Sequence, residues 1–443
     1  MRVKSFLPFF VVMFSMFVSV VSAQAIRVSD RQVFIVPTIE ARDILNSDSL
    51  SCESWTAIGE TMLVIGGEGW MKTLDKKKVA YKTHPIGKTD EIWLLTTKDP
   101  SLKNIEFAGA RQIFRANGFA VFMGDEITKM GFTSKYSSDF SRVDPLPGNE
   151  ELLSMPRYPL KTTRNDATGE LLDRLNREAF TTDLKVFLDC KTRYTYTEGA
   201  MQALAYAEKV MTDLGLAVKR LPFGSSGQKR ENLEGFQAGS DASNAGEVIV
   251  IGHLDSTSEQ AKTFAPGADD NGSGSAGVLA LARLMKGLKP RANVRFVLVL
   301  GEEQAILGSK AFAAALKPEE VARIRCVINM DMIGFDAKQP LSMQIETSKS
   351  FTQTARQFAD LAAKYTTMTT VTSYNPWGSD HVPFIKKEIP AVLTIESEFD
   401  DNPTYHKTTD VFEKVNLDLC HQILRLNAAV LAETAGVEKL SER

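Results

Sequence analysis

Residues 248–255 read Val-Ile-Val-Ile-Gly-His-Leu-Asp, an apolar run that ends directly in an imidazole and a carboxylate. Three more short apolar runs, rich in β-branched residues, occupy positions 294–300, 327–330 and 391–395. Runs without polar alternation are typical of strands buried on both faces, as in parallel or mixed sheets. Helical patterns at 275–288 and 351–365 supply the crossovers between them. The sequence therefore predicts an α/β fold, with a mixed, mostly parallel sheet sandwiched by helices.

A side chain able to bind a metal or a proton follows each of these predicted strands. In chain order these side chains are His253 and Asp255, Glu302 and Glu303, Asp331, and then Glu396 with His406 ten residues later. The segment 267–274, Gly-Ala-Asp-Asp-Asn-Gly-Ser-Gly, adds two carboxylates just before a predicted helix. Because the carboxyl ends of strands in an open α/β sheet meet at one crevice, we expect these groups to lie together.

The convergence of so many carboxylates indicates bound metal. Burying unpaired carboxylates is costly, and divalent cations would offset that cost. A mixture of two histidines and at least three carboxylates, without thiolates, suits zinc or a related metal. Each motif alone also has an ordinary interpretation, such as a solvated acidic loop or a tight turn at Asn271-Gly272. The combination at successive strand ends is what favours a functional site.

Composition and charge exclude several classes of protein. The 443 residues are 43% hydrophobic and 24% charged, which is ordinary for a globular protein and unlike a disordered or coiled-coil chain. The formal charge of −3 provides no basic field for binding nucleic acid, so no nucleic-acid partner is expected. Four cysteines, Cys52, Cys190, Cys326 and Cys420, permit disulfides but are too few to form a disulfide framework. We expect Cys326, which opens an apolar run, to be a buried free thiol.

The N-terminus resembles an export signal. Arg2 and Lys4 precede an apolar run at 6–21, and Val21-Ser22-Ala23 supplies small residues for cleavage. The run is shorter than the roughly 20 residues needed to span a bilayer, which disfavours the alternative of an uncleaved anchor. We therefore predict a signal peptide at 1–23, a secreted or periplasmic protein, and no membrane association after its removal.

The rest of the chain divides near a proline-rich stretch at 141–165, interpreted as an exposed linker. We predict a small α/β N-terminal module at 24–160 and a catalytic domain at 161–443. In the module, short apolar runs predict strands at 32–36, 61–65, 92–96 and 119–123, and residues 108–116 predict a helix. No internal repeat is evident, and the module carries no chemical motif.

Five motifs together resemble one known family. They are His253-x-Asp255, Gly267-Ala268-Asp269-Asp270-Asn271-x-Ser273-Gly274, Glu302-Glu303, Met330-Asp331-Met332 and His406-x-Thr408-x-Asp410. In this order they are similar to the signature of the bacterial leucyl aminopeptidase family, secreted zinc-dependent exopeptidases with two zinc ions. The resemblance covers roughly residues 165–435 and implies a monomeric enzyme that removes apolar, leucine-type residues from peptides with a free N-terminus.

The resemblance also implies a role for each residue at the site. Asp269 would bridge two zinc ions, with His253 and Asp331 completing one ligand set and Glu303 and His406 the other. Glu302 would be the general base, and Asp255 would orient His253. The chemistry is consistent, because two metals sharing a carboxylate can hold a hydroxide and polarise the scissile carbonyl.

Other interpretations remain open at this point. A glutaminyl cyclase-like transferase would share the fold but use a single zinc, and a degenerate relative would serve only for binding. Carboxypeptidase-type substrates are also compatible with the same strand-end ligands. The module at 24–160 is either a propeptide or a permanent accessory domain. Ser379-Asp380-His381 lacks the Gly-x-Ser-x-Gly elbow of a serine hydrolase. The resemblance implies that this segment lies near the substrate pocket instead.

Overall fold

A computed structural model describes residues 31–47, 52–97, 102, 105–116, 118–137, 141–160, 166–224, 229–336, 339–397 and 399–437. The predicted signal peptide at 1–23 lies outside these residues. Among the helices that the structure describes, none is both long enough and apolar enough to cross a membrane.

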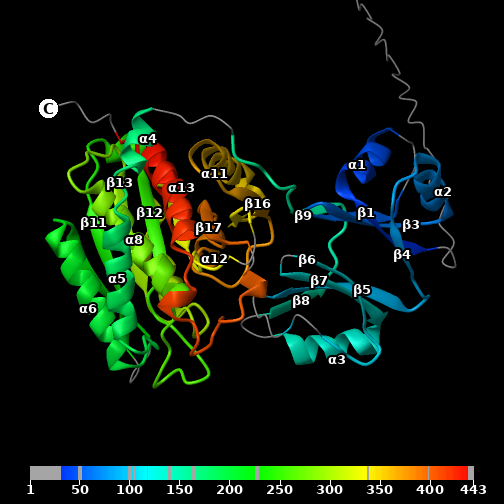
Figure 1. The fold of residues 1–443 in the computed structure, drawn as a ribbon, viewed down its shortest axis with the longest axis horizontal. Helices are drawn as coiled ribbons and strands as arrows, with labels where there is room; N and C mark the ends of the chain where they lie inside the picture. Colours follow the sequence, from blue (N-terminus) through cyan, green and yellow to red (C-terminus); the bar gives the residue numbers. More distant parts are fainter. Residues whose placement is uncertain are drawn as a thin grey trace, which may run out of the picture.

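The larger part of the molecule is built on a mixed sheet (Figure 1). Its strands lie in the order β10 (Ala217–Phe223), β11 (Arg230–Gln237), β13 (Asn293–Val299), β12 (Glu247–His253), β14 (Ile324–Met330), β17 (Ala391–Glu396), β15 (Ser342–Glu346) and β16 (Thr369–Ser373). The central strands β13, β12, β14 and β17 are parallel to one another, whereas β11 and β15 pair antiparallel with this group. The predicted mixed sheet is therefore confirmed.

Helices cover both faces of this sheet. Alternate residues of each strand point to opposite faces, and the central strands place apolar side chains on both. Val248 and Val250 of β12 join the core under one layer of helices, whereas Ile249 and Ile251 join the core on the other side. The first layer comprises α5 (Arg177–Asp189), α6 (Glu198–Asp213), α8 (Gly274–Met285), α11 (Thr352–Tyr365) and α13 (Leu417–Ala435). The opposite face is covered by α9 (Leu307–Ala315) and α12 (Val382–Ile385).

The N-terminal module consists of two units with the same strand topology. The first contains β1 (Gln32–Pro37), α1 (Thr38–Ser47), β2 (Ser54–Ile58), β3 (Thr61–Gly66), α2 (Glu68–Lys77) and β4 (Lys82–Pro85). The second contains β5 (Asp90–Thr97), β6 (Arg111–Ala116), β7 (Phe119–Asp125), α3 (Glu126–Tyr136) and β8 (Ser141–Pro145). The strand orders are β2-β3-β1-β4 and β6-β7-β5-β8, all antiparallel, which is the order of a split β-α-β unit in each case. The module thus repeats one strand topology, although no internal repeat is evident in its sequence.

Two expectations about this module were wrong. Residues 108–116, expected to be helical, contain strand β6, which pairs antiparallel with β7. The pairing partner lies in the next segment of chain, and tertiary contacts of this kind override a weak local helix preference. The stretch at 141–165 is not a simple exposed linker, because it contributes β8 and also β9 (Glu150–Leu153).

Strand β9 joins the two parts of the molecule into one sheet. It pairs in parallel with β2 of the module and antiparallel with β16 of the larger part. The chain continues alongside β16, where Arg157 and Thr370 exchange backbone hydrogen bonds of 2.7 and 2.9 Å. The resulting sheet has 13 strands and runs across the molecule (Figure 1).

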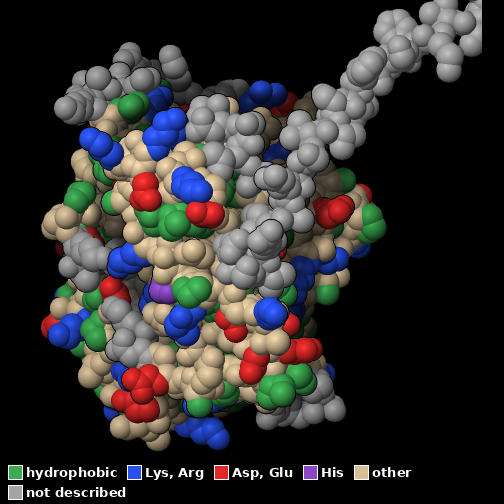
Figure 2. Space-filling view, turned by 90° about the vertical axis from the view of Figure 1, so that its right-hand side faces the viewer, with side chains coloured by type: hydrophobic (Ala, Val, Ile, Leu, Met, Phe, Trp, Pro, Cys, Tyr) green, Lys and Arg blue, Asp and Glu red, His purple; other side chains and the backbone are tan. Residues whose placement is uncertain are grey.

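The cysteines and the surface fit the predictions from composition. All four cysteines are free, and Cys326 is buried as expected. Figure 2 views the molecule from the side of the N-terminal module, and there basic and acidic side chains are interspersed without a large patch of one sign. This distribution matches the formal charge of −3.

Candidate active site

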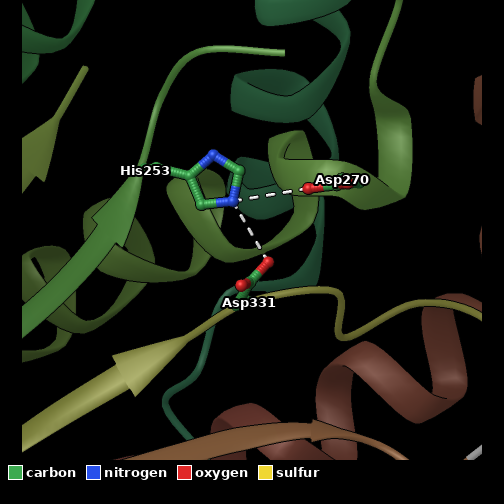
Figure 3. Close-up of side chains that lie close together, drawn as sticks. All are labelled: His253, Asp270 and Asp331. Carbon is green, nitrogen blue, oxygen red and sulfur yellow. Dashed lines mark hydrogen bonds and ion pairs between the residues drawn. The ribbon is translucent and has the colours of Figure 1, made fainter. Parts of the chain in front are cut away.

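The carboxyl ends of two parallel strands and the loop that contains Asp270 bring the first group of candidate ligands together. His253 is the last residue of β12, and Asp331 directly follows β14. The Nε2 atom of His253 lies 3.1 Å from Oδ1 of Asp331 and 3.3 Å from Oδ1 of Asp270 (Figure 3). All three side chains are buried. The ends of β12 and β14 therefore converge on one place, as expected from the sequence.

A second group lies beside the first and shares Asp270 with it. The Nε2 atom of His406 lies 3.2 Å from Oδ2 of Asp270 and 3.0 Å from Oε2 of Glu303. Each of the two candidate metal sites therefore contains one imidazole and two carboxylates, and the two oxygens of Asp270 face different sites. Ligand atoms about 2.0–2.1 Å from a tetrahedral zinc ion are separated by about 3.3 Å. The observed separations of 3.0–3.3 Å match that geometry.

Asp269 does not belong to either group, contrary to the bridging role expected for it. Its Oδ1 accepts a hydrogen bond from the backbone N–H of Gly334, and its Oδ2 accepts one from Asn402. The side-chain amide of Asn402 also donates a hydrogen bond to Glu396. The Glu396 carboxylate is therefore likewise directed away from the two candidate metal sites. The structure places Asp270 where Asp269 was expected, because successive side chains of this loop point in different directions. Asp270, rather than Asp269, is thus the carboxylate that the two groups share.

Hydrogen bonds with two buried residues, Asp410 and Arg193, fix the loop that carries these two aspartates. Both oxygens of Asp410 accept hydrogen bonds from the backbone N–H groups of Asp269 and Asp270, at 2.9 and 3.0 Å. The fully buried guanidinium of Arg193 donates to the carbonyl oxygens of Leu254, Pro266 and Gly267. Arg193 thus ties the end of β12 to the start of the aspartate loop, a role that sequence reasoning missed because no motif surrounds it.

Asp255 is buried under the site and contacts two of its other segments. Its carboxylate accepts hydrogen bonds from the backbone N–H groups of Glu302 and Glu303, both at 3.3 Å, and from the Thr195 hydroxyl at 2.8 Å. The Nδ1 atom of His253 lies 3.2 Å from the backbone carbonyl oxygen of Asp255 and 3.7 Å from its carboxylate. Asp255 therefore fixes the loop after β13 as well as lying against the imidazole.

The electrostatics of the two groups favour a cation between the carboxylates. Burial by itself would lower the pKa of His253 and His406, but the surrounding carboxylates outweigh it and raise both well above the ordinary value. Burial raises the pKa of Glu303 to about 7, although His406 opposes the shift. Both oxygens of Glu303 are buried and accept no hydrogen bond of regular geometry from the described residues. Such a carboxylate is suited to binding a metal ion.

Glu302 is buried at the site but lies outside both ligand groups. Burial, with Asp331, Asp380 and Glu303 nearby, raises the pKa of Glu302 well above its ordinary value, although His253 opposes this. Its side chain lines a small pocket whose other walls are Asp270, Ala305, Ile306, Asp331, Met332, Trp377, Gly378, Tyr405 and His406. Glu302 is thus placed to exchange a proton with a molecule in that pocket.

The Ser379-Asp380-His381 segment lies next to the pocket, the location that the resemblance implied. Ser379 donates a hydrogen bond of 2.6 Å to Oδ2 of Asp331 and so orients this carboxylate. Asp380 accepts a hydrogen bond from Ser309, and His381 lies 3.3 Å from Glu346. The three side chains therefore point to different partners and do not form a nucleophile–base pair.

Comparisons with known proteins bear on this site. Residues 236–431 match the model of peptidase family M28. A probable leucine aminopeptidase of Arthroderma otae is 27% identical over 331 residues, a match that covers 71% of this chain and 85% of the relative.

Solved structures show the same fold at low sequence identity. The LapA aminopeptidase of Legionella pneumophila is 17% identical, with a TM-score of 0.55 over 78% of this chain and 98% of that one. A glutaminyl cyclase of Macrostomum lignano is also 17% identical, with a TM-score of 0.54 over 64% of this chain and 95% of that one. The fold alone therefore does not separate these two chemistries.

Proposed function

We propose, from the match of residues 236–431 to the model of peptidase family M28, that the chain is a two-zinc aminopeptidase acting on apolar, leucine-type N-terminal residues. The observation that carries the proposal is the pair of ligand groups sharing Asp270. We assign His253, Asp270 and Asp331 to one zinc ion, and Asp270, Glu303 and His406 to the other. We further propose that the mature protein is monomeric and acts outside the cytoplasm.

Bound zinc would supply Lewis acidity for the scissile carbonyl and would lower the pKa of a water molecule. The protein's own groups perform the remaining tasks. Glu302 accepts a proton from the attacking water at a carboxylate oxygen and then donates it to the leaving amine. Asp255 holds the backbone of Glu302 in place, and Ser379 fixes the orientation of Asp331. The acidic pocket also attracts the positively charged amino terminus of a peptide.

A substrate panel with metal analysis tests the proposal. We expect about two zinc ions per chain and hydrolysis of leucine p-nitroanilide. The panel also contains a peptide with N-terminal glutamine and a peptide blocked at its amino group. Cyclisation of the glutamine peptide without leucyl hydrolysis would favour the transferase alternative, and cleavage of the blocked peptide from its other end would favour a carboxypeptidase.

Removing the metal is expected to destabilise the catalytic domain. A ligand present at about 100 times its Kd stabilises the folded state by about 2.7 kcal/mol, which corresponds to several degrees in Tm for a domain of this size. We therefore expect a chelator to lower the Tm by about 5–10 °C and added zinc to restore it. The measurement is thermal unfolding of the same sample before chelation, after chelation and after zinc is added back. An unchanged Tm in a sample shown to be metal-free would contradict this expectation.

We propose that the N-terminal module stays attached as an accessory domain. Cleavage after residue 160 would uncover the edge of β16, where the N–H groups of Thr370 and Tyr374 now donate to Arg157 and Leu152. Exposed strand edges promote aggregation. We expect residues 166–437 alone to have a lower Tm and to aggregate more than residues 31–437, as measured by thermal unfolding and light scattering. Equal stability and activity of the two chains would instead support a propeptide.

A further inference from the structure

A second cavity, of about 330 Å³, lies next to the catalytic pocket. The two share four wall residues, Ala305, Ile306, Trp377 and Gly378, so they adjoin each other. The cavity lies between α9 and α12, on the face of the sheet opposite the large helical layer. Its volume is at the lower end of the range for small-molecule sites, which is enough for a short segment of peptide.

The walls of this cavity are apolar, and its charges are all positive. Ala313, Ala314, Val382 and Pro383 supply apolar surface. Among the described residues that line it, Lys310, Lys386 and Lys387 are the charged ones, and none carries a carboxylate. All three lysines are exposed, and none forms an ion pair with a carboxylate that the structure describes. Lys310 donates a hydrogen bond of 2.7 Å to the carbonyl oxygen of Ala305, at the boundary between cavity and catalytic pocket.

The two adjoining cavities therefore carry opposite charge. Asp270, Glu302 and Asp331 line the catalytic pocket, where the ammonium group of a peptide would be attracted. The three lysines line the adjoining cavity, where a negative group would be attracted. A peptide with a positive amino end and a carboxylate a short distance along its chain matches this separation of charge.

We propose that the cavity lined by Lys310, Lys386 and Lys387 binds a carboxylate one or two residues beyond the scissile bond. The inference rests on the proposed aminopeptidase function and specifies its substrates. These are peptides with acidic residues at those positions, or di- and tripeptides whose own C-terminal carboxylate falls there. The carboxylate improves substrate binding through ion pairing with exposed lysines, so salt weakens the effect.

Two pairs of peptides test the proposal and separate the two sources of the carboxylate. The first pair is Leu-Ala-Ala as the free acid and as the C-terminal amide, and the second is Leu-Glu-Ala-amide and Leu-Gln-Ala-amide. We expect the acidic member of at least one pair to have a kcat/KM about fivefold higher at low salt, chiefly through a lower KM. Leucine p-nitroanilide, which has no carboxylate, provides the baseline.

The matched variants are Lys310→Gln/Lys386→Gln/Lys387→Gln and a control, Lys76→Gln/Lys88→Gln/Lys289→Gln, at exposed lysines outside the cavity. We expect the first variant to lose the preference for the acidic peptides and to keep anilide hydrolysis, and the control variant to keep both. A wild-type enzyme that hydrolyses the anilide but shows no acidic preference would overturn the inference alone. A preference that survives in the first variant would also overturn it. Absence of anilide hydrolysis in the zinc-loaded wild type would overturn the proposed function together with it.

Discussion

Replacing Asp270 by asparagine is expected to remove most of the metal from both sites and to lower kcat for leucine p-nitroanilide by about a thousandfold or more. Asp270 offers one oxygen to each group, so its loss weakens both at once. Lewis-acid activation by metal contributes several kcal/mol to transition-state stabilisation, and each 1.36 kcal/mol is tenfold in rate. Metal content by mass spectrometry and steady-state kinetics on the same preparation measure the two effects.

The matched control is Asp269→Asn, one residue away. The Asp269 carboxylate accepts hydrogen bonds from Gly334 and Asn402 and faces neither metal group. We expect this variant to lose about 1–3 kcal/mol of stability through the altered hydrogen bonds but to keep its metal. If Asp269→Asn lost the metal and Asp270→Asn kept it, the original assignment from the motif would be correct and the geometric one wrong.

Replacing Glu302 by glutamine is expected to lower kcat by about 10²–10⁴-fold without loss of metal. Glutamine keeps the shape of the side chain but cannot accept the proton from water. Glu302 belongs to neither ligand group, so zinc content should stay at the wild-type value. The measurement combines metal analysis with kcat and KM for leucine p-nitroanilide.

The neighbouring residue provides the control for this prediction. Glu303 lies 3.0 Å from His406 in the second ligand group, so Glu303→Gln should lose metal as well as turnover. Wild-type turnover in Glu302→Gln would exclude Glu302 as the general base. Loss of metal from Glu302→Gln would instead make it a ligand.

Most of the candidate site could be predicted because strand ends have a known geometry. His253 is the last residue of a buried parallel strand, and Glu303 and Asp331 come after two others. Such strand ends meet at one edge of the sheet. The choice between Asp269 and Asp270 could not be made from the motif, which contains both. It depends on the directions of side chains in a loop fixed by Asp410 and Arg193. Asp410 belongs to one of the five motifs, but its hydrogen bonds to the loop, like those of Arg193, join segments far apart in the chain.

The fold, like the site, has features that the sequence determines and features that only the tertiary structure decides. The sequence by itself determined the buried parallel strands and the helices between them, because hydrophobic periodicity is a local property. It also determined which residue types are available for chemistry. The tertiary structure alone decided that β6 is a strand, that β9 joins the module to β16, and that three lysines from α9 and the end of α12 face one cavity. The strand β6 depends on pairing with the segment that follows it. The other two features depend on pairing and packing between segments far apart in the chain, and a local sequence pattern does not encode such contacts.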